Sequence, residues 1–452
     1  MKKILTLLLA LWMLTGCVAM AAENQLVVGS TTAMSGAFFT DLFGSNTADI
    51  DVRALLHGYN LMSWDHETGT YQINDSVVAG MAVSMDAQNN RVYTFDLYGD
   101  LKFSDGSAIT AKDYAFSILL TASPELAKLG GQSAAVGAIL GMDAYQSGKS
   151  SVLRGVRLLS DTQMSITISK AYEPYFYEMA LFDYSPYPIS VLAPGCKVVD
   201  TEKGVGIVNA GGTGTAIFTA GLLQKTILDA ATGYMSHPSV VSGPYTLTSY
   251  DAQSGTASFA INPYYKGNED GEKPTIETIV YRTVANDEAI DLLLSGEVDL
   301  LNKMVAADTI SKGIQSTADQ PFSVANYPRS GLSMISFSCE RQTVSGKAVR
   351  QAIASCFDRD ALVKAYTGNF GLKANGYFGI GQWMYQLAAG TIQPPVADLP
   401  ANATAKETAA YEKTVAQWDA LSLDKLKDYP LDLDQAAKLL GQDEWRAGQG
   451  RI

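Results

Sequence analysis

Few side chains of this sequence combine residue type and spacing in a way that supports catalysis. The three histidines, His57, His66 and His237, belong to no HExxH zinc motif, and no GxSxG nucleophile motif is present. His57, within LLHGYN, has the best case for a functional role among them. Carboxylate pairs serve glycosidases as acid and base, but no spacing sets one pair apart among the 46 acidic residues. These residues therefore give an enzyme little support.

The cysteines give no sign of a metal centre. Beyond Cys17, the chain has Cys196, Cys339 and Cys356, which form neither a CxxC motif nor a cysteine–histidine spacing typical of zinc. An odd number of cysteines in a long chain predicts thiols buried in the core rather than a disulfide framework. We therefore expect no metal and no cofactor.

The first residues have the composition of an export signal. Lys2 and Lys3 precede an apolar run, residues 4–14, which is too short to span a membrane. The following LTGC resembles the bacterial lipobox, in which the cysteine, here Cys17, becomes the lipidated N-terminus. The small residues of AMAA, 19–22, offer ordinary signal-peptidase cleavage as an alternative. Both possibilities predict an exported protein, either anchored by lipid to the outer face of the membrane or secreted or periplasmic.

Composition and charge narrow the class further. The chain has 452 residues, of which 47% are apolar and 17% charged, and this is the composition of a globular protein with two or three domains. Its formal net charge of −13 argues against binding to nucleic acid, whose phosphates attract clustered Lys and Arg. The same charge argues against contact with an anionic membrane surface, apart from an N-terminal lipid.

Local patterns in the first half predict strands and one capped helix. LVVGS, 26–30, reads as a strand, and RVYTFDL, 91–97, alternates with its aromatic side chains on the buried face. Thr110 suits a helix N-cap with Asp113 three residues on, after a turn that contains Asp105-Gly106. The glycine-rich 204–221 lacks the Gly-Lys-Ser/Thr of a phosphate loop, and we expect a flexible surface excursion there.

The second half alternates strand and helix signals. Strand patterns cover 243–250, 257–267, 275–284 and the EVDLL that begins at Glu297. We expect Asn286 to cap a helix that ends at Gly296, a helix carrying Val349, and a further helix that begins after Asp358 and stops near Gly368.

The order of several segments resembles that of the family 5 extracellular solute-binding proteins, the peptide- and nickel-binding receptors of ABC importers. The stretches that carry the resemblance are YTFDLYGDLKFSDGSAITAKDYAFSI, SGPYTLTSYD, INPYYKGN, KPTIETIVYR, LLLSGEVDLL and VRQAIASCFDRDALV. Their order along the chain extends the resemblance over nearly the whole chain after the signal. The resemblance implies an α/β fold with mixed sheets: a two-lobed, periplasmic-binding-protein-like fold with an extra subdomain, whose hinge closes on the ligand. In this family the Ser-Asp-Gly turn and capped helix belong to the scaffold beside the cleft.

The resemblance also implies a domain organisation. The expected parts are a signal peptide (1–22), the core subdomain of the first lobe (23–48 and 165–300), its extra subdomain (49–164), and an apparently truncated second lobe (301–452).

The implied function is capture of oligopeptides in the cleft between the lobes and delivery to the permease of an ABC importer, by a monomer. Peptide-binding relatives use backbone hydrogen bonds to an extended peptide, with roomy side-chain pockets. Two alternatives remain: a secreted hydrolase of peptide or glycan, and a nickel or haem receptor of the same fold, which three scattered histidines do not favour.

Five residues are candidates for the ligand cleft. Phe38 and Phe39 lie in the loop after the first strand, which faces the cleft in relatives; Arg329 begins the second lobe; Trp383 and Tyr385 lie in YFGIGQWMY. For the aromatic residues the alternative is packing in the core, and for Arg329 it is a surface salt bridge.

The end of the chain departs from the family pattern. LDLDQAAKLLGQDEW, 431–445, resembles a landmark that in relatives lies well before the C-terminus, and seven residues follow it here. In relatives the later stretch completes the second lobe and, in peptide-binding members, carries the acidic group for the peptide's amino terminus. From this departure we expect unpaired sheet edges, low stability and weak or absent peptide binding by this chain alone.

Overall fold

The computed structural model divides into two compact units, which are described separately. The described residues are 24–44, 46–65, 70–132, 137–172, 178–317, 321–327, 332–368, 370–392, 399, 402–442, 445–446 and 450–451. Unit 1 extends to Trp64 and from Tyr71 to Lys303, whereas unit 2 comprises Asp65–Thr70 and the chain from Met304 onward. The predicted signal peptide and Cys17 lie outside the described residues. Within those residues, no helix has both the length and the apolar character needed to cross a membrane.

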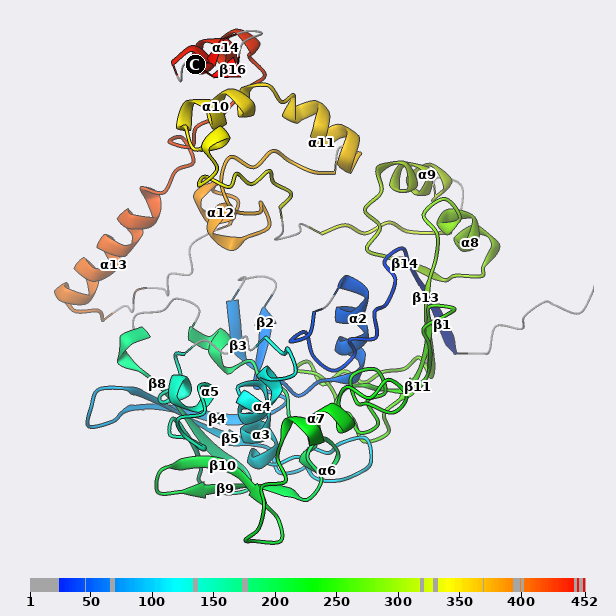
Figure 1. Cartoon of the computed structure of the whole chain (residues 1–452), viewed down its shortest axis with the longest axis vertical. Coiled ribbons are helices and arrows are strands. Elements are labelled where there is room, and N and C mark those ends of the chain that lie inside the picture. Colours follow the sequence, from blue (N-terminus) through cyan, green and yellow to red (C-terminus); the bar gives the residue numbers. More distant parts are fainter. Residues whose placement is uncertain are drawn as a thin grey trace, which may run out of the picture. The chain divides into compact units, whose positions relative to one another are not determined.

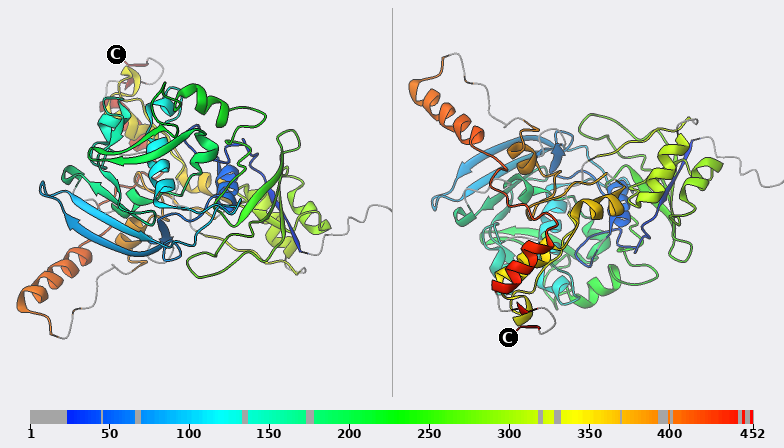
Figure 2. Two further views of the ribbon diagram at one scale, coloured as in Figure 1. Left: turned by 90° about the horizontal axis from the view of Figure 1, so that it is seen from below. Right: turned by 90° about the horizontal axis from the view of Figure 1, so that it is seen from above.

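The elements up to β14 alternate strands with short helices (Figures 1 and 2). The strands are β1 (Gln25–Ser30), β2 (Met62–Asp65), β3 (Thr70–Ile73), β4 (Val78–Met85), β5 (Arg91–Leu97), β6 (Val152–Leu153), β7 (Val156–Leu158), β8 (Gln163–Ile168), β9 (Cys196–Thr201), β10 (Gly204–Asn209), β11 (Tyr245–Asp251), β12 (Thr256–Ile261), β13 (Thr278–Thr283) and β14 (Leu300–Asn302). The helices are α2 (Thr47–Leu56), α3 (Ala111–Thr121), α4 (Pro124–Ala127), α5 (Met142–Gln146), η1 (Lys170–Tyr172), η2 (Glu178–Phe182), α6 (Ile189–Leu192), α7 (Ala220–Thr226) and α8 (Ala289–Ser295).

A five-stranded sheet of order β11-β12-β13-β1-β14 holds the N-terminal strand near its middle. β1 pairs in parallel with β13 on one side and β14 on the other, whereas β11, β12 and β13 are joined by antiparallel pairs. The sheet is therefore mixed, as predicted. Its core includes Val28, Phe38, Val52 and Phe259, so that α2 packs against the sheet through its apolar face.

A second and larger core lies between two antiparallel sheets and α3. The sheets have the orders β4-β5-β8-β7 and β6-β10-β9, and α3 contacts β7, β9 and β10. α3 is buried almost all round, with no exposed surface at Tyr114 or Phe116. The predicted cap is confirmed, because Thr110 and Asp113 form a capping box at its N-terminus. A helix so completely enclosed is structural scaffold, which agrees with the role that the resemblance gives this stretch.

Two local predictions for unit 1 are wrong. Asn286 is not the N-cap of α8, which begins later, after Glu288, although Gly296 ends the helix in the left-handed conformation with φ 77° as expected. The glycine-rich stretch is not simply a flexible excursion: its first six residues form β10, which pairs along its whole length with β9. The cross-strand hydrogen bonds outweigh the low strand propensity of glycine there.

Unit 2 is mainly helical. Its elements are α9 (Ala307–Thr317), η3 (Gln342–Val344), α10 (Lys347–Ser355), α11 (Arg359–Thr367), α12 (Trp383–Ala388), α13 (Ala405–Asp419), α14 (Leu433–Gln442), β15 (Trp445–Arg446) and β16 (Gly450–Arg451). The predicted cap at Asp358 and the left-handed end at Gly368 are both confirmed.

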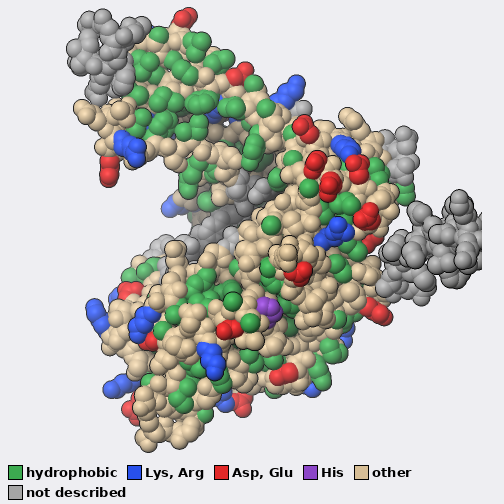
Figure 3. All heavy atoms as spheres, turned by 45° about the vertical axis from the view of Figure 1, so that its right-hand side comes forward, with side chains coloured by type: hydrophobic (Ala, Val, Ile, Leu, Met, Phe, Trp, Pro, Cys, Tyr) green, Lys and Arg blue, Asp and Glu red, His purple; other side chains and the backbone are tan. Residues whose placement is uncertain are grey.

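Among the described residues of unit 2, few apolar side chains are buried. Val349 and Ala352 on α10 are buried, α10 contacts α14, and the Asp432 amide donates to the Ser355 carbonyl over 2.8 Å. Many large apolar side chains remain exposed, and hydrophobic atoms gather on the face of this unit that Figure 3 displays. Tyr377 keeps 81% of its surface exposed.

The three described cysteines are free thiols, but their environments differ from the prediction. Cys196 is buried in the larger core, whereas Cys339 and Cys356 are exposed. The expectation of core thiols is therefore wrong for the latter two, because the segments that carry them lie at the surface of unit 2.

Candidate functional site

Three parallel strands of unit 1 end side by side. In register, Ser30 at the end of β1 lies opposite Thr283 at the end of β13 and Asn302 at the end of β14. The strands on either side of β1 arrive from later parts of the chain, so the connections diverge at this edge. Ligands of open α/β sheets bind outside the carboxyl ends of strands at such a point, and we take this edge as the starting point of the candidate site.

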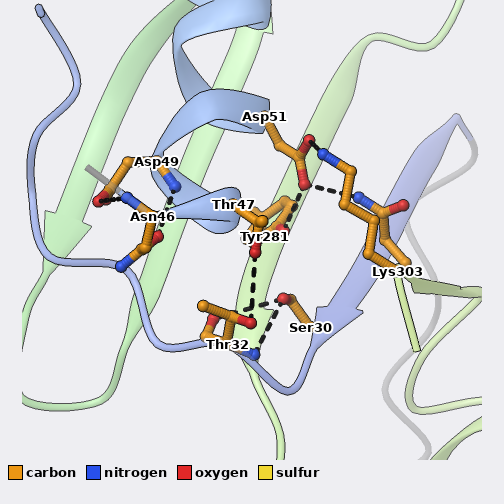
Figure 4. A network of polar contacts seen from close by, with 9 residues as sticks. Ser30, Thr32, Asn46, Thr47, Asp49, Asp51, Tyr281 and Lys303 are labelled. Atoms are coloured by element: carbon orange, nitrogen blue, oxygen red, sulfur yellow. Dashed lines mark hydrogen bonds and ion pairs between the residues drawn. The ribbon is translucent and has the colours of Figure 1, made fainter. Parts of the chain in front are cut away.

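The loop after β1 is fixed by Asp49 on α2. This buried carboxylate accepts hydrogen bonds from the Ser35 amide at 2.9 Å, the Ser35 hydroxyl at 2.6 Å and the Asn46 amide at 3.3 Å. The Asn46 side chain accepts in turn from the Asp49 amide, which completes a capping box (Figure 4). The loop therefore enters α2 in a defined conformation.

Asp51, two residues further along α2, accepts hydrogen bonds from side chains of two strands. Its carboxylate accepts from the Asn302 side chain at 2.7 Å and the Tyr281 hydroxyl at 3.0 Å, and it pairs with the Lys303 ammonium group (Figure 4). Burial raises the pKa of Tyr281 to about 12, and the Asp51 charge adds to this shift. Lys303 has a positive φ of 55°, which is unusual for a residue other than glycine. Asp51 thus holds the last residue of unit 1 in place.

The same loop lines a hollow of about 790 Å³ in unit 1. Its walls come from the loop after β1, from the stretch that follows α7, and from the end of β11; they comprise Ser35, Gly36, Ala37, Phe43, Gly44, Asn46, Leu228, Asp229, Ala230, Met235, Ser236, His237, Tyr250 and Ala252. This volume lies within the range of small-molecule sites.

The lining of the hollow combines apolar side chains with a few polar groups. The Tyr250 ring packs edge-on against Phe38 at 4.6 Å between centroids, and burial raises the pKa of its phenol. The Ser236 hydroxyl lies 3.3 Å from Nδ1 of His237. Hydrogen bonds from the Thr232 and Ala231 amides lower the pKa of Asp229, whose carboxylate they hold within its own turn. Hydroxyl, imidazole and carboxylate groups of this kind can hydrogen-bond to amide and carbonyl groups of a ligand.

Phe38 and Phe39, predicted for the cleft, are both buried in this structure. Phe38 has no exposed surface and belongs to the core of the five-stranded sheet, whereas Phe39 belongs to the larger core and contacts Tyr187 and Tyr234 edge-on. Consecutive rings therefore anchor the loop to both cores. Packing accounts for both rings here, and contact with a ligand stays a prediction.

His57 lies in the same aromatic surroundings. Its Nε2 is 3.0 Å from the Phe38 carbonyl oxygen, to which it donates, and Phe39 lies 5.9 Å away between ring centroids. Burial lowers its pKa to about 4, against the smaller opposite effect of this hydrogen bond. A neutral, enclosed imidazole that fixes a carbonyl has a structural role. The role suggested for His57 by the sequence is therefore that of positioning the loop after β1.

The remaining predicted residues belong to unit 2. Tyr385 lies on α12, partly buried, with its ring 5.4 Å from that of Phe378. Trp383 begins the same helix, and its side chain lies outside the described residues, as does Arg329. Their contact with a ligand stays a prediction.

Sequence reasoning did not identify Asp49, Asp51, His237 or Tyr250 as residues of this region. The NTAD pattern of residues 46–49 is a capping-box signal that could have located α2 and Asp49. No local signal indicates Asp51, because its partners lie more than 200 residues away.

Comparison with known proteins places the chain among binding proteins. It is 24% identical over 305 residues to the periplasmic oligopeptide-binding protein OppA of Escherichia coli, an alignment that covers 66% of this chain and 48% of that protein. It is also 24% identical over 366 residues to the oligopeptide-binding protein OppA of Lactococcus lactis, covering 78% and 49%. The chain thus spans about half the length of these curated relatives.

Solved structures show the same fold. Lactococcal OppA, complexed with an endogenous peptide in the closed conformation, matches with a TM-score of 0.62 and 19% identity, over 94% of this chain and 67% of that chain. The oligopeptide-binding protein from Thermus thermophilus, complexed with a pentapeptide, matches with a TM-score of 0.58 and 17% identity, over 94% and 64%. The predicted α/β class and periplasmic-binding-protein-like fold are confirmed.

The family follows from a match across most of the chain. The sequence profile of the bacterial extracellular solute-binding proteins, family 5, middle region, matches residues 76–452. The relatives named above are binding proteins rather than enzymes, which supports the expectation that this chain does not catalyse a reaction. The chain belongs to the bacterial extracellular solute-binding proteins of family 5.

Proposed function

We propose that this protein captures oligopeptides outside the cell and delivers them to the permease of an ABC importer. The observation that carries the proposal is the hollow of unit 1, at the loop after β1, in a chain whose relatives are named for binding oligopeptides. Family membership leaves the ligand open, so the class of ligand is the part that needs a test.

The chemistry of the hollow suits a peptide. A peptide backbone offers amide donors and carbonyl acceptors at every residue, and the hollow offers the Ser236 hydroxyl and the His237 imidazole beside the apolar Leu228 and Met235. A mixed lining of this kind accepts varied side chains while fixing the backbone. No group of three potential metal-ligating side chains is found in the described part of the chain, and the proposal involves no metal.

Native mass spectrometry of the purified protein tests the ligand class directly. We expect short peptides to co-purify with the protein, with no strict side-chain preference, and this result would overturn the expectation of weak or absent binding that the departure at the end of the chain raised. A metal or a sugar with no peptide would overturn the proposal.

Export is tested separately. If Cys17 accepts a lipid, Cys17→Ala releases the protein into the medium. A wild-type protein that palmitate does not label would remove the lipoprotein alternative.

A matched pair of substitutions tests the hollow. Ala252 lines it and is exposed, so Ala252→Trp fills the space without removing a side-chain hydrogen bond. Ala210 is equally exposed in a different loop, and Ala210→Trp serves as the control. In calorimetric titration with a mixed peptide pool, we expect A252W to weaken binding at least tenfold relative to A210W. Equal binding by both variants would exclude the hollow as the peptide site.

A further inference from the structure

A second polar cluster of unit 1, away from the residues that line the hollow, lies beside the short strand β2. The segment Asn60–Leu61 precedes β2, and Asp183–Tyr184 follows the 3-10 helix η2. The Leu61 amide donates to the Tyr184 carbonyl over 3.1 Å, and the Asn60 side chain donates to Oδ1 of Asp183 over 2.7 Å. Two segments far apart in the sequence are therefore fixed side by side, with the Asp183 carboxylate between them.

The charge of Asp183 has no cationic partner in the described part of the chain. Glu178, five residues earlier on η2, shows the usual arrangement for an enclosed carboxylate: Arg91 donates to it over 2.6 Å and the Tyr93 hydroxyl over 2.7 Å. Asp183 instead receives one hydrogen bond from a neutral amide, and burial raises its pKa, against the smaller effect of that bond. A desolvated carboxylate with this one donor gains most from a cation placed next to it.

An aromatic pair lies within reach of that charge. The rings of Trp64 on β2 and Tyr71 on β3 meet edge-on with 5.1 Å between centroids, and Trp64 keeps 40% of its surface exposed. The Asn74 side chain, directly after β3, donates to the Asn60 carbonyl over 2.9 Å, so the strand of Tyr71 ends next to the residue that holds Asp183. The Asp183 charge adds to the effect of burial in raising the pKa of Tyr71. Exposed aromatic faces next to a carboxylate attract ammonium and guanidinium groups.

We propose that Asp183, Trp64 and Tyr71 form a subsite for an organic cation, namely the Lys or Arg side chain of a bound peptide. Asn60 is a positioning residue, because it orients the carboxylate without contacting the cation. The proposal rests on the peptide-binding function proposed above and adds to it a preference for basic peptides. Since the chain as a whole is acidic, with a net charge of −13, attraction at long range favours the same ligands.

Matched peptides measure the preference. Ala-Lys-Ala and Ala-norleucine-Ala share a side-chain stem and differ in the charge at its end. By calorimetric titration of the wild-type protein, we expect the lysine peptide to bind about tenfold more tightly. Asp183→Asn should abolish this difference. Asp161→Asn, which removes the same charge from an exposed surface pair with Lys112, should preserve the difference.

Two further measurements separate this proposal from the proposed function. Binding of both peptides with equal affinity by the wild type, or a preference that survives in D183N, overturns the subsite and leaves peptide binding intact. If neither peptide binds, the proposed peptide capture is wrong, and the subsite is tested separately with lysine amide and norleucine amide. NMR of the Asp183 carboxyl signal then measures its pKa in the presence of each compound. We expect lysine amide alone to lower the pKa of Asp183, and an unchanged pKa would overturn the subsite. Should D183N not fold, Trp64→Leu provides the same peptide comparison.

Discussion

Unit 1 and unit 2 use similar local structure and differ in what surrounds it. In unit 1, α2 begins at a capping box and α8 ends at a left-handed glycine, and in unit 2 α11 has both a capping aspartate and a left-handed glycine at its end. Unit 1 adds two extensive clusters of buried apolar side chains, whereas among its described residues unit 2 buries few, such as Val349 and Leu387. Local signals thus form helices in both units, but burial of apolar surface stabilises mainly unit 1.

The difference has a consequence for function. The candidate site of unit 1 is held by the buried carboxylate of Asp49, by the partly buried carboxylate of Asp51 and by rings anchored in both cores, so its geometry is fixed before a ligand arrives. The described side chains of unit 2 that carry apolar surface, such as Tyr366 and Leu372, remain largely exposed. Regions with few buried contacts open at lower free energy, and we expect unit 2 to be the more mobile part.

The largest test of this comparison is a pair of core truncations. Phe95 has no exposed surface and packs 5.4 Å from Phe182, so Phe95→Ala should lower the free energy of unfolding by about 3–5 kcal/mol. Leu387→Ala in unit 2 removes a side chain that is also buried, at 7% exposure, but among the described residues of this unit few apolar side chains are buried, so the surroundings can relax into the gap. We expect less than half the loss. Denaturant unfolding followed by fluorescence measures both, and equal losses would contradict the comparison.

The second test uses pH to examine two enclosed groups of unit 1 that act in opposite directions. His57 has a folded pKa of about 4, below its ordinary value of 6.5, so its neutral form stabilises the fold above pH 6.5 and that contribution falls as pH decreases towards 4. Asp113 has a folded pKa of about 6, above 3.8, so its contribution is fully present below pH 3.8 and is lost as pH rises through 6. Each contribution amounts to about 3 kcal/mol, and between pH 4 and 6 the two contributions largely cancel.

Single substitutions should reveal how each group alone makes the unfolding free energy depend on pH. In His57→Gln the unfolding free energy should decrease as pH rises from 4 to 6, whereas in Asp113→Asn it should increase over the same range. Denaturant midpoints measured at half-unit steps of pH give the slopes. A wild-type slope in both core variants would show that neither group is enclosed as described.

The sequence predicted those features that depend on neighbouring residues. The capping box of Thr110 and Asp113, the cap at Asp358 and the left-handed ends at Gly296 and Gly368 follow from local hydrogen bonding and from the freedom of glycine. The alternation in RVYTFDL likewise predicted the buried face of β5.

Features that depend on distant partners escaped prediction. Asp51 binds side chains from β13 and β14, and Asp183 lies beside Asn60 because a backbone hydrogen bond joins two remote segments. The hollow is formed by three separate stretches of the chain. Such contacts depend on the tertiary fold, and the pattern around each residue contains no record of them.

The third test concerns the end of unit 1. Asp51→Ala removes the acceptor of the Lys303 ammonium, the Asn302 amide and the Tyr281 hydroxyl, and should cost about 1–3 kcal/mol of stability. Hydrogen exchange of β14 amides should rise more than that of β12 amides, because the loss lies at the junction. Asp287→Ala, an exposed carboxylate near α8, is the control and should change stability by less than about 0.5 kcal/mol. Uniform exchange across the sheet would contradict a local role for Asp51.

The smallest effects come from one capping motif that occurs in both units. Asn46 caps α2 with Asp49, and Thr404 caps α13 with Glu407 by the same reciprocal hydrogen bonds. α2 is packed on a core, so Asn46→Ala should lower the global unfolding free energy by about 1 kcal/mol.

No buried side chain anchors α13, so Thr404→Ala should fray that helix and leave the denaturant midpoint unchanged. The Thr404 hydroxyl and amide lower the pKa of Glu407, and the substitution should raise that pKa towards its ordinary value in NMR titration. A carboxyl group with a lowered pKa stabilises its cap at pH values above its ordinary pKa, and this stabilisation is lost on acidification. The wild-type helix should therefore fray as pH falls. A shift of the global midpoint in T404A would mean that α13 belongs to the cooperative core after all.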